Sequence, residues 1–316
     1  MSAWGFCSDN FFLFGIYCND GRHIPYYMKG RKNMATFFNQ ATLSYSGGVV
    51  NSNITSGEIL EVLSVTKTAV DGEYMQDSDV TYVVNIINSG NVAFSGLTLT
   101  DDLGAYFFGG TQLYPLDYVS DTVTYFINGV LQTTPLVNEG PPLTISGISV
   151  PANGVATIAY TARANSYASP ETLGSIVNTV TVSGGGITPI SDTETVTAAQ
   201  KPLLDITKSV SPATVTENGQ ITYTFVIRNT GNTEAVATDS VVLTDQFNPI
   251  LEGITVSYNG SVITSPDDYT YDETTGLFST TLGTITVPAA TYVQDVTTGM
   301  WMVTPGEVVV TVTGTV

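Results

Sequence analysis

The sequence predicts an all-β protein, and three observations lead to that fold class. Thr supplies 48 of the 316 residues, and together with abundant Val and Ile and 30 Gly it suits pleated strands joined by tight turns. Alternate residues such as Val80, Tyr82, Val84 and Ile86 place apolar side chains on one face of a strand. Helical periodicity nowhere extends beyond two turns. Because 42% of the residues are hydrophobic and 10% are aromatic, the chain can bury a core, and we do not expect disorder.

Charge narrows the range of partners. Only 12% of the residues are charged and the net charge is −19, so phosphate backbones and anionic lipid surfaces are unfavourable partners. No apolar run approaches the roughly 20 residues that a transmembrane helix needs. We therefore predict no nucleic acid partner, no membrane insertion and no cofactor.

The first 33 residues differ in composition from the rest. Cys7, Cys18, His23 and four of the nine basic residues all precede Met34. The segment is a poor match to a signal peptide. Lys29-Gly30-Arg31-Lys32 can be encoded by a purine-rich stretch that resembles a bacterial ribosome-binding site. We expect the natural chain to start at Met34 and residues 1–33 to be a non-native or disordered extension. Without Cys or His after Met34, thiol nucleophiles, His-based triads and zinc sites are excluded, and we expect no metal site.

The remaining chain contains two copies of one unit. The first copy has Leu63 to Thr68, Val80 to Tyr82, Asn88 to Asn91, Leu97 to Asp101, Asn128-Gly129 and Ile148 to Pro151. The second copy has, in the same order, Leu204 to Ser209, Ile221 to Tyr223, Asn229 to Asn232, Val241 to Asp245, Asn259-Gly260 and Ile285 to Pro288. Alternation and closely spaced turn signals predict two tandem Ig-like antiparallel β-sandwiches. We assign residues 34–59 to an N-terminal β-hairpin arm, 60–200 to Ig-like repeat domain 1 and 201–316 to Ig-like repeat domain 2.

The two copies end differently. Copy one continues through Ile176 to Gly185 and Ile190 to Val196, which predicts a closing hairpin, whereas copy two stops after the strand expected at 307–314. A similar segment, Asn39 to Gly48 followed by Val50 to Thr55, precedes copy one. Since proteins rarely leave a sheet edge open, we expect the hairpin of residues 36–55 to complete domain 2. It can do so in the next subunit or in its own chain, and we favour exchange between subunits, with Ala41, Leu43 and Tyr45 filling the seam.

The ordered motifs from Thr66-Lys67 to Leu99-Thr100-Asp101, with their second copy, resemble the conserved-repeat domain of bacterial and archaeal surface proteins known as domain of unknown function 11. The resemblance covers nearly all of residues 60–316. It implies an Ig-like module with a structural role at an extracellular cell or spore surface rather than an enzyme.

Three residue types recur at matching places in the two copies. Lys67 and Lys208 lie on the first strands, Asp101 and Asp245 lie mid-copy, and Asn178 and Asn39 lie in the two closing hairpins. Such sets resemble the isopeptide-forming triads of Gram-positive pilin and adhesin Ig-like domains. In that chemistry burial favours a neutral amine and a protonated carboxyl, and fixed proximity supplies most of the remaining rate. A simpler interpretation stays open, in which the lysines pair with acids on a solvated face and the aspartates begin turns.

We therefore expect a self-assembling surface fibre subunit, a head-to-tail homopolymer. The alternatives are a monomeric adhesin or stalk module with an unknown surface ligand, and a carbohydrate-active enzyme. Acidic groups such as Asp117 with Asp121, and Asp267-Asp268 with Asp272-Glu273, leave calcium binding open, although none has the ligand spacing of a known calcium loop.

Overall fold

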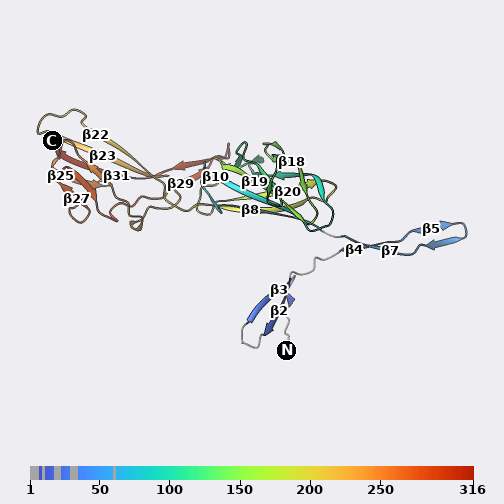
Figure 1. The fold of residues 1–316 in the computed structure, drawn as a ribbon. Coiled ribbons are helices and arrows are strands. Elements are labelled where there is room, and N and C mark those ends of the chain that lie inside the picture. The colour runs from blue at the N-terminus through green and yellow to red at the C-terminus, as the bar shows by residue number, and fades with distance from the viewer. Residues whose placement is uncertain (1–6, 9–10, 18–22, 29–34, 60–61) are drawn as a thin grey trace. The chain divides into compact units, whose positions relative to one another are not determined.

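The computed structural model describes residues 7–8, 11–17, 23–28, 35–59 and 62–316. Within them the fold is all-β, as predicted, apart from one short 3-10 helix, η1, Ala237–Asp239 (Figure 1). The described residues divide into two compact units, Met1–Ser64 and Val65–Val316. No helix in the described ranges is long and apolar enough to span a membrane.

The first unit consists of antiparallel ribbons. Strands β1 (Cys7–Ser8), β2 (Phe11–Tyr17) and β3 (His23–Met28) form one small sheet. The predicted start at Met34 lies outside the described residues. A long hairpin follows, which we call the arm hairpin (residues 35–59). Its strands are β4 (Ala35–Asn39) paired with β7 (Thr55–Ile59), and β5 (Thr42–Tyr45) paired with β6 (Gly48–Asn51).

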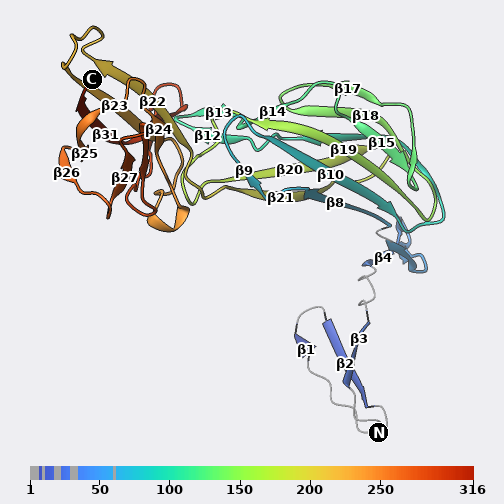
Figure 2. The same ribbon diagram turned by 60° about the vertical axis from the view of Figure 1, so that its left-hand side comes forward.

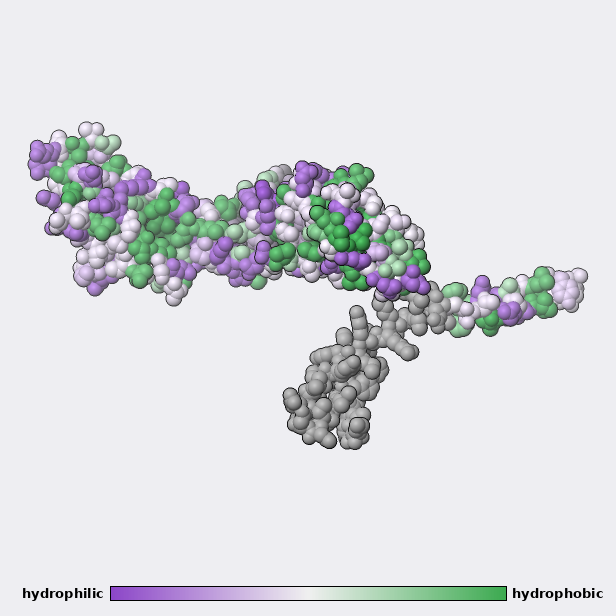
Figure 3. Space-filling view, viewed as in Figure 1, coloured by the Kyte–Doolittle hydropathy of each residue, from purple (hydrophilic) through white to green (hydrophobic). Residues whose placement is uncertain are grey.

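Every arm-hairpin side chain from residue 37 to residue 56 is exposed. These include large apolar side chains, namely Phe37, Phe38, Leu43, Tyr45, Val49, Val50 and Ile54. Figure 3 shows hydrophobic and hydrophilic residues interspersed along this ribbon. An isolated two-stranded hairpin is marginally stable at best. The apolar side chains of the arm hairpin have no core to pack against among the described residues.

The second unit begins with a sandwich of two largely antiparallel sheets, whose long strands run side by side in Figure 2. One sheet has the order β16-β15-β19-β10-β8, with β14 also paired to β19, and the other has the order β17-β18-β11-β20-β21-β9. We call this the first sandwich. Its strands are β8 (Leu63–Ala69), β9 (Glu73–Tyr74), β10 (Asp79–Asn88), β11 (Phe94–Asp101), β14 (Leu116–Tyr118), β15 (Thr124–Ile127), β16 (Val130–Leu131), β17 (Leu136–Asn138), β18 (Leu143–Val150), β19 (Gly154–Ala164), β20 (Ser175–Gly184) and β21 (Ile190–Ala198). A separate small hairpin comprises β12 (Tyr106–Phe108) and β13 (Thr111–Leu113).

The second sandwich repeats this plan with fewer strands. Its sheets have the orders β22-β23-β31-β25-β26 and β24-β28-β27. The strands are β22 (Leu204–Ser211), β23 (Gln220–Asn229), β24 (Thr244–Gln246), β25 (Glu252–Tyr258), β26 (Ser261–Ile263), β27 (Tyr269–Asp272), β28 (Leu277–Thr280) and β31 (Gly306–Thr315). An additional hairpin, β29 (Thr291–Gln294) with β30 (Trp301–Thr304), lies between β28 and β31 in the chain.

The two sandwiches correspond strand for strand until the second one stops. The five-stranded orders are the same, with β22, β23, β31, β25 and β26 in the places of β8, β10, β19, β15 and β16. In the other sheet, β24, β28 and β27 take the places of β11, β18 and β17. Strand β11 continues its sheet through β20 and β21, whereas β24 is an edge strand among the described residues. Among the described residues, the second sandwich has no strands in the places of β20 and β21.

The motif Asn88-x-Gly90 and its second copy serve one structural purpose. The Asn88 side chain accepts from the Gly90 amide at 2.9 Å and donates to the carbonyls of Val92 and Pro151. In the second sandwich Asn229 accepts from the amides of Gly231 and Leu203 and donates to the carbonyls of Thr233 and Val287. Both asparagines are buried, so each pins a turn to a distant strand end with satisfied hydrogen bonds.

Candidate cross-link and assembly sites

Lys67 and Asp101 form a buried ion pair in the core of the first sandwich. Lys67 lies on β8 and Asp101 ends β11, and the Lys67 Nζ to Asp101 Oδ2 distance is 2.5 Å with both side chains inaccessible to solvent. Burial lowers the pKa of Lys67, which outweighs the opposing effect of Asp101. Lowering the pKa favours the neutral, nucleophilic amine. One proton moved from Nζ to Oδ2 would produce both forms that amide formation requires.

A tight turn after β11 fixes the carboxylate. The Leu103 amide donates to Asp101 Oδ1 at 2.8 Å, and the Gly104 amide donates to the neighbouring Asp102 at 2.9 Å. Gly104 has φ +71°, and a Cβ there would lie 2.5 Å from Ile176. The backbone at this position therefore requires glycine, and β20 packs directly against it.

Asn178 of β20 joins the same buried site. Its Oδ1 accepts from the Gly104 amide at 3.3 Å, and the side chain is wholly buried. Its Nδ2 and the hydroxyl of Tyr82 are both buried, and neither has a partner with hydrogen-bond geometry among the described residues. Burial raises the pKa of Tyr82 and the nearby Asn178 side chain partly opposes that rise, so the two groups are neighbours. Tyr82 in turn lies under Lys67, with Nζ 4.5 Å from its ring centroid. The three predicted residues of the first copy thus share one buried site, in which the asparagine NH₂ group is unsatisfied.

Sequence reasoning missed two residues here. Tyr160 of β19 donates its hydroxyl hydrogen to Asp101, and burial raises its pKa well above the ordinary value. Asp192 of β21 accepts from the Lys67 backbone amide at 2.7 Å. Tyr160 lies opposite Tyr82 in the β10–β19 ladder. The alternation of inward-facing residues along β19 could therefore have identified Tyr160 as a neighbour of the site.

The second copy holds its pair at the surface instead. Lys208 of β22 forms an ion pair with Asp245 of β24, and the lysine side chain is 40% exposed and the aspartate 18%. Lys208 Nζ lies 4.5 Å from the ring centroid of Tyr223 and 5.4 Å from that of Phe247, so the lysine has the same aromatic neighbour as Lys67. The third predicted member, Asn39, is exposed on the arm hairpin at the end of β4.

A groove runs beside this pair. It has a volume of about 310 Å³ and is lined by Leu204 to Ile206 of β22, Ile227 of β23 and Val241 to Thr244 at and before β24. Every residue of β22 is exposed. Ile206 is 51% exposed, whereas Val65, its counterpart on β8, is 9% exposed. The groove occupies the place that β20 fills in the first sandwich.

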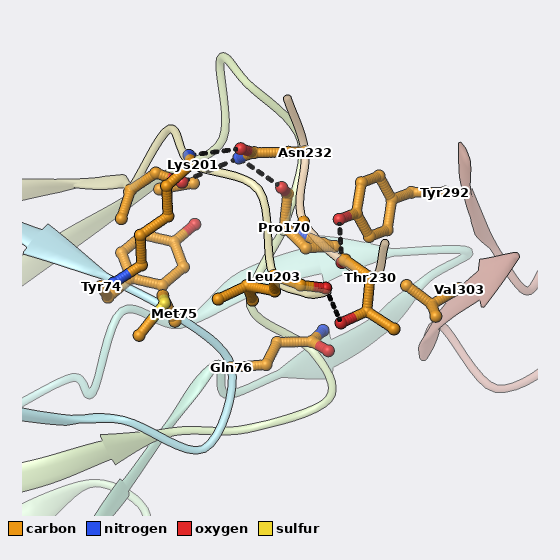
Figure 4. A pocket seen from close by; sticks show the side chains of 13 residues that line it. Tyr74, Met75, Gln76, Pro170, Lys201, Leu203, Thr230, Asn232, Tyr292 and Val303 are labelled. Carbon is orange, nitrogen blue, oxygen red and sulfur yellow. Dashed lines mark hydrogen bonds between the residues drawn. The ribbon is translucent and has the colours of Figure 1, made fainter. Parts of the chain in front are cut away.

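A second pocket, of about 230 Å³, lies where the two sandwiches meet (Figure 4). Asn232 donates to the carbonyls of Pro170 and Ala199, both at 3.0 Å, and accepts from the Lys201 amide. Tyr292 donates to the Thr230 carbonyl at 2.7 Å. The Asn232 side chain thus ties the second sandwich to backbone carbonyls of residues 170 and 199, and we call this connection the joint.

The joint is reinforced by the additional hairpin of the second sandwich. Gln294 of β29 donates to the Tyr106 hydroxyl at 3.0 Å, and the Trp301 amide of β30 donates to the Ser166 carbonyl at 2.9 Å. These contacts link β29–β30 to the β12 hairpin and to the loop after β19.

The acidic groups that left calcium binding open act partly in turns. Asp268 accepts from the Thr264 amide at 2.9 Å, and Asp272 accepts from the Thr274 amide at 2.8 Å. Asp117 is exposed on β14. In the described part of the chain, no three or more Asp, Glu, His or Cys side chains are grouped so as to hold a metal ion.

No protein-family profile matches the chain, and no curated protein matches it by sequence. The assignment to the conserved-repeat surface domain therefore stays a prediction. Among solved structures, the chain is similar to BcpA, the major pilin subunit of Bacillus cereus, with 11% identity, 94% of this chain and 79% of that chain covered, and a TM-score of 0.31.

It is also similar to the pilus backbone protein RrgB of Streptococcus pneumoniae, with 14% identity, 77% of this chain and 55% of that chain covered, and a TM-score of 0.32. A type II cohesin dyad from the scaffoldin ScaA of Acetivibrio cellulolyticus matches at 11% identity, with 79% of this chain and 84% of that chain covered and a TM-score of 0.26. TM-scores this low carry no functional conclusion.

Proposed function

We propose that the chain is a structural subunit of an extracellular surface fibre, and that the arm hairpin of one subunit completes the second sandwich of the next. The observation that carries this proposal is the open edge of β24, which within the described residues has no neighbour where β11 pairs with β20. The arm hairpin has the sequence pattern of the missing β20–β21 hairpin, and its apolar side chains are exposed. Two exposed apolar surfaces of complementary strand pattern in one molecule support β-strand addition between copies.

The first sandwich supplies the register for this addition. There Asp101 lies opposite Val180 and Leu99 lies opposite Val182. With Asn39 in the place of Asn178, Ala41 is expected opposite Asp245 and Leu43 opposite Leu243. Residues 37, 39, 41 and 43 then face inward, as Ile176, Asn178, Val180 and Val182 do in β20, where all four are buried. The groove beside β24 would receive Ala41 and Leu43.

Assembly of this kind is heterologous. The donor surface lies at residues 35–59 and the acceptor surface lies at β22 and β24, so each added subunit presents a new acceptor. Repetition of such a contact produces an open filament unless its rotation closes a ring. Closure within one chain would instead give a monomer that behaves as an adhesin or stalk module.

An amide bond between Lys67 and Asn178 in the first sandwich fits the same role. It would join the first strand to a last strand and protect the sandwich against pulling, and like a disulfide it would restrict the unfolded chain. The unsatisfied Nδ2 of Asn178 supports this reaction, because leaving a buried donor unpaired costs about 1–3 kcal/mol and loss of ammonia removes that donor. The family resemblance would place the fibre at the surface of a bacterial or archaeal cell or spore.

Deletion of residues 34–56 tests the assembly mechanism. We expect the full chain to form filaments in negative-stain electron microscopy and the deletion variant to remain monomeric by size-exclusion chromatography. Filaments that form unchanged without the segment would contradict the mechanism. A full chain that stays monomeric at every concentration would support closure within one chain.

A further inference from the structure

We propose that docking of the arm hairpin switches on a second amide bond, between Lys208 of one subunit and Asn39 of the next, so that each subunit becomes covalently linked only after it has joined the fibre. This inference rests on the proposed strand exchange. Two equivalent sites in the same chain differ in a way that supports it.

The two sites share their chemistry and differ in burial. Lys67 and Asp101 are inaccessible to solvent, whereas Lys208 and Asp245 are 40% and 18% exposed. Both lysines lie over the corresponding tyrosine at 4.5 Å. The amine and the acid of the second site are therefore in place before assembly, and among the described residues no strand covers them as β20 covers Asp101.

The missing strands account for both deficiencies. In the first sandwich β20 contributes Asn178 and also covers β11, while Asp192 of β21 accepts from the backbone of Lys67. A docked arm hairpin would likewise bring Asn39 to the pair and cover β22 and β24. Water around the exposed pair stabilises its charged forms, and removal of that water favours the neutral amine and the protonated acid.

The reaction is balanced without a further reagent. Lys208 transfers one proton to Asp245, and the neutral Nζ attacks Cγ of Asn39. The new Nζ–Cγ bond forms, the Cγ–Nδ2 bond breaks, and two of the three protons of the Lys208 ammonium group pass through the Asp245 carboxyl and leave with Nδ2 as an ammonium ion. Nothing is oxidised or reduced, and the acid is regenerated in the ion form it had at the start.

The dependence on docking gives the fibre an order of events. Before docking, the exposed lysine lacks the carboxamide partner that Asn178 provides in the first sandwich, so an unassembled subunit keeps a reversible acceptor. After docking, fixed proximity replaces an encounter in solution, which is worth a large factor in rate. A hairpin docked in the wrong register would not bring Asn39 to Lys208 and would be free to leave.

Mixing of two full-chain variants tests this proposal. Asn39→Ala keeps Lys208, and Lys208→Met keeps Asn39, so neither variant can form the bond with itself. We expect wild-type protein to give a ladder after boiling in detergent, each variant alone to give only monomer, and the mixture to give a covalent dimer, one ammonia lighter than its two chains. Gln40→Ala, at the neighbouring outward position, should keep the full ladder.

Detergent resistance reports the amide bond, and filament formation reports strand exchange. Wild-type filaments that dissolve completely to monomer in detergent would overturn the amide bond and leave strand exchange standing. Monomer in the boiled mixture would overturn bonding between subunits, and a wild-type monomer one further ammonia lighter would place the bond within one chain. Failure of the wild-type chain to form filaments would overturn the proposed function together with this inference. Asn39→Ala filaments that are visible by microscopy yet dissolve in detergent are the expected sign of docking without the bond.

Discussion

Tyr160 donates its hydroxyl hydrogen to Asp101 in the first sandwich, and Val312 occupies the same ladder position in the second. Tyr82 and Tyr223 face these positions across the ladder. The two acids thus differ in their neighbours as well as in exposure. The two tyrosine hydroxyls of the first sandwich also differ in hydrogen bonding. The Tyr160 hydroxyl donates to a carboxylate, whereas the Tyr82 hydroxyl has no hydrogen bond by geometry among the described residues.

Removal of each hydroxyl should therefore have opposite consequences for stability. In an Asn178→Ala background, which cannot form the amide bond, Tyr160→Phe should lower the free energy of unfolding by about 1.5–3 kcal/mol, the usual value for a hydrogen bond to a charged group. Tyr82→Phe should be neutral or stabilising, because it removes a buried hydroxyl that lacks a partner among the described residues. Urea titration of the two variants measures the difference. Equal losses would show that the Tyr160 hydrogen bond contributes nothing particular.

The cross-link in the first sandwich predicts a change in mass. Wild-type protein should be lighter by one ammonia for the Lys67–Asn178 bond, and Asp101→Ala should have the full mass because the acid that accepts the lysine proton is absent. Asp117→Asn, at an exposed position on β14, should keep the wild-type mass loss. Intact mass and a branched peptide joining Lys67 to Asn178 are the measurements. A free Lys67 in fully folded wild-type protein would exclude the bond.

Burial of Lys67 also predicts a dependence of stability on pH. Its pKa in the folded state is lowered from 10.5 by burial, so in the window between the lowered value and 10.5 the unfolded chain binds more protons. The free energy of unfolding should therefore rise as the pH rises through that window. The comparison is made below pH about 10, where unfolded tyrosines begin to titrate.

The pair for this measurement is Asn178→Ala with and without Lys67→Met. The variant that keeps Lys67 should gain stability with increasing pH relative to the variant that lacks it. Parallel pH profiles for the two variants would show that the lysine proton is not linked to folding.

The paired asparagine turns predict matching losses in the two sandwiches. Asn88→Ala removes a buried side chain that accepts from one backbone amide and donates to two carbonyls, and Asn229→Ala removes one that accepts from two backbone amides and donates to two carbonyls. Each should lower the stability of its own sandwich by about 1–3 kcal/mol. Asn91→Ala, at an exposed position in the same motif, is the control and should be near neutral. Thermal unfolding followed by calorimetry would show which of the two transitions moves.

Much of the fold could be predicted from the sequence because strands carry a strict period of two. Val80, Tyr82, Val84 and Ile86 are all wholly buried on β10, as the alternation indicates. The repeated motifs also predicted which strands correspond, since Asn88 and Asn229 fix equivalent turns. The β29–β30 hairpin and the joint that it forms have no counterpart in the first copy, so comparison of the copies could not predict them.

The sequence indicated which residues belong to the candidate site, but it did not indicate how deeply each of them is buried. Equivalent positions in the two copies indicated Lys67, Asp101 and Asn178. The fold brings them together because each is an inward-facing residue on one of three strands that line the same core. Exposure could not be predicted, since it depends on which strands are present beside each residue. The contrast between the buried Lys67 and the exposed Lys208 is a consequence of tertiary structure.

The alternation of the arm hairpin provides the final prediction. Leu43 should face the groove beside β24, and Ser44 should face solvent, because neighbouring residues on a strand point to opposite faces. Leu43→Arg would place a charge against Leu243 and Ile206 and lose the burial of a leucine, worth about 1.5–3 kcal/mol before the cost of the charge. Assembly should therefore require a much higher protein concentration, whereas Ser44→Arg should assemble as the wild type does. Light scattering against concentration measures both critical concentrations. If Ser44→Arg is the variant that blocks assembly, the hairpin enters with the opposite face inward, and a shift of one residue in the register would move Asn39 away from Lys208.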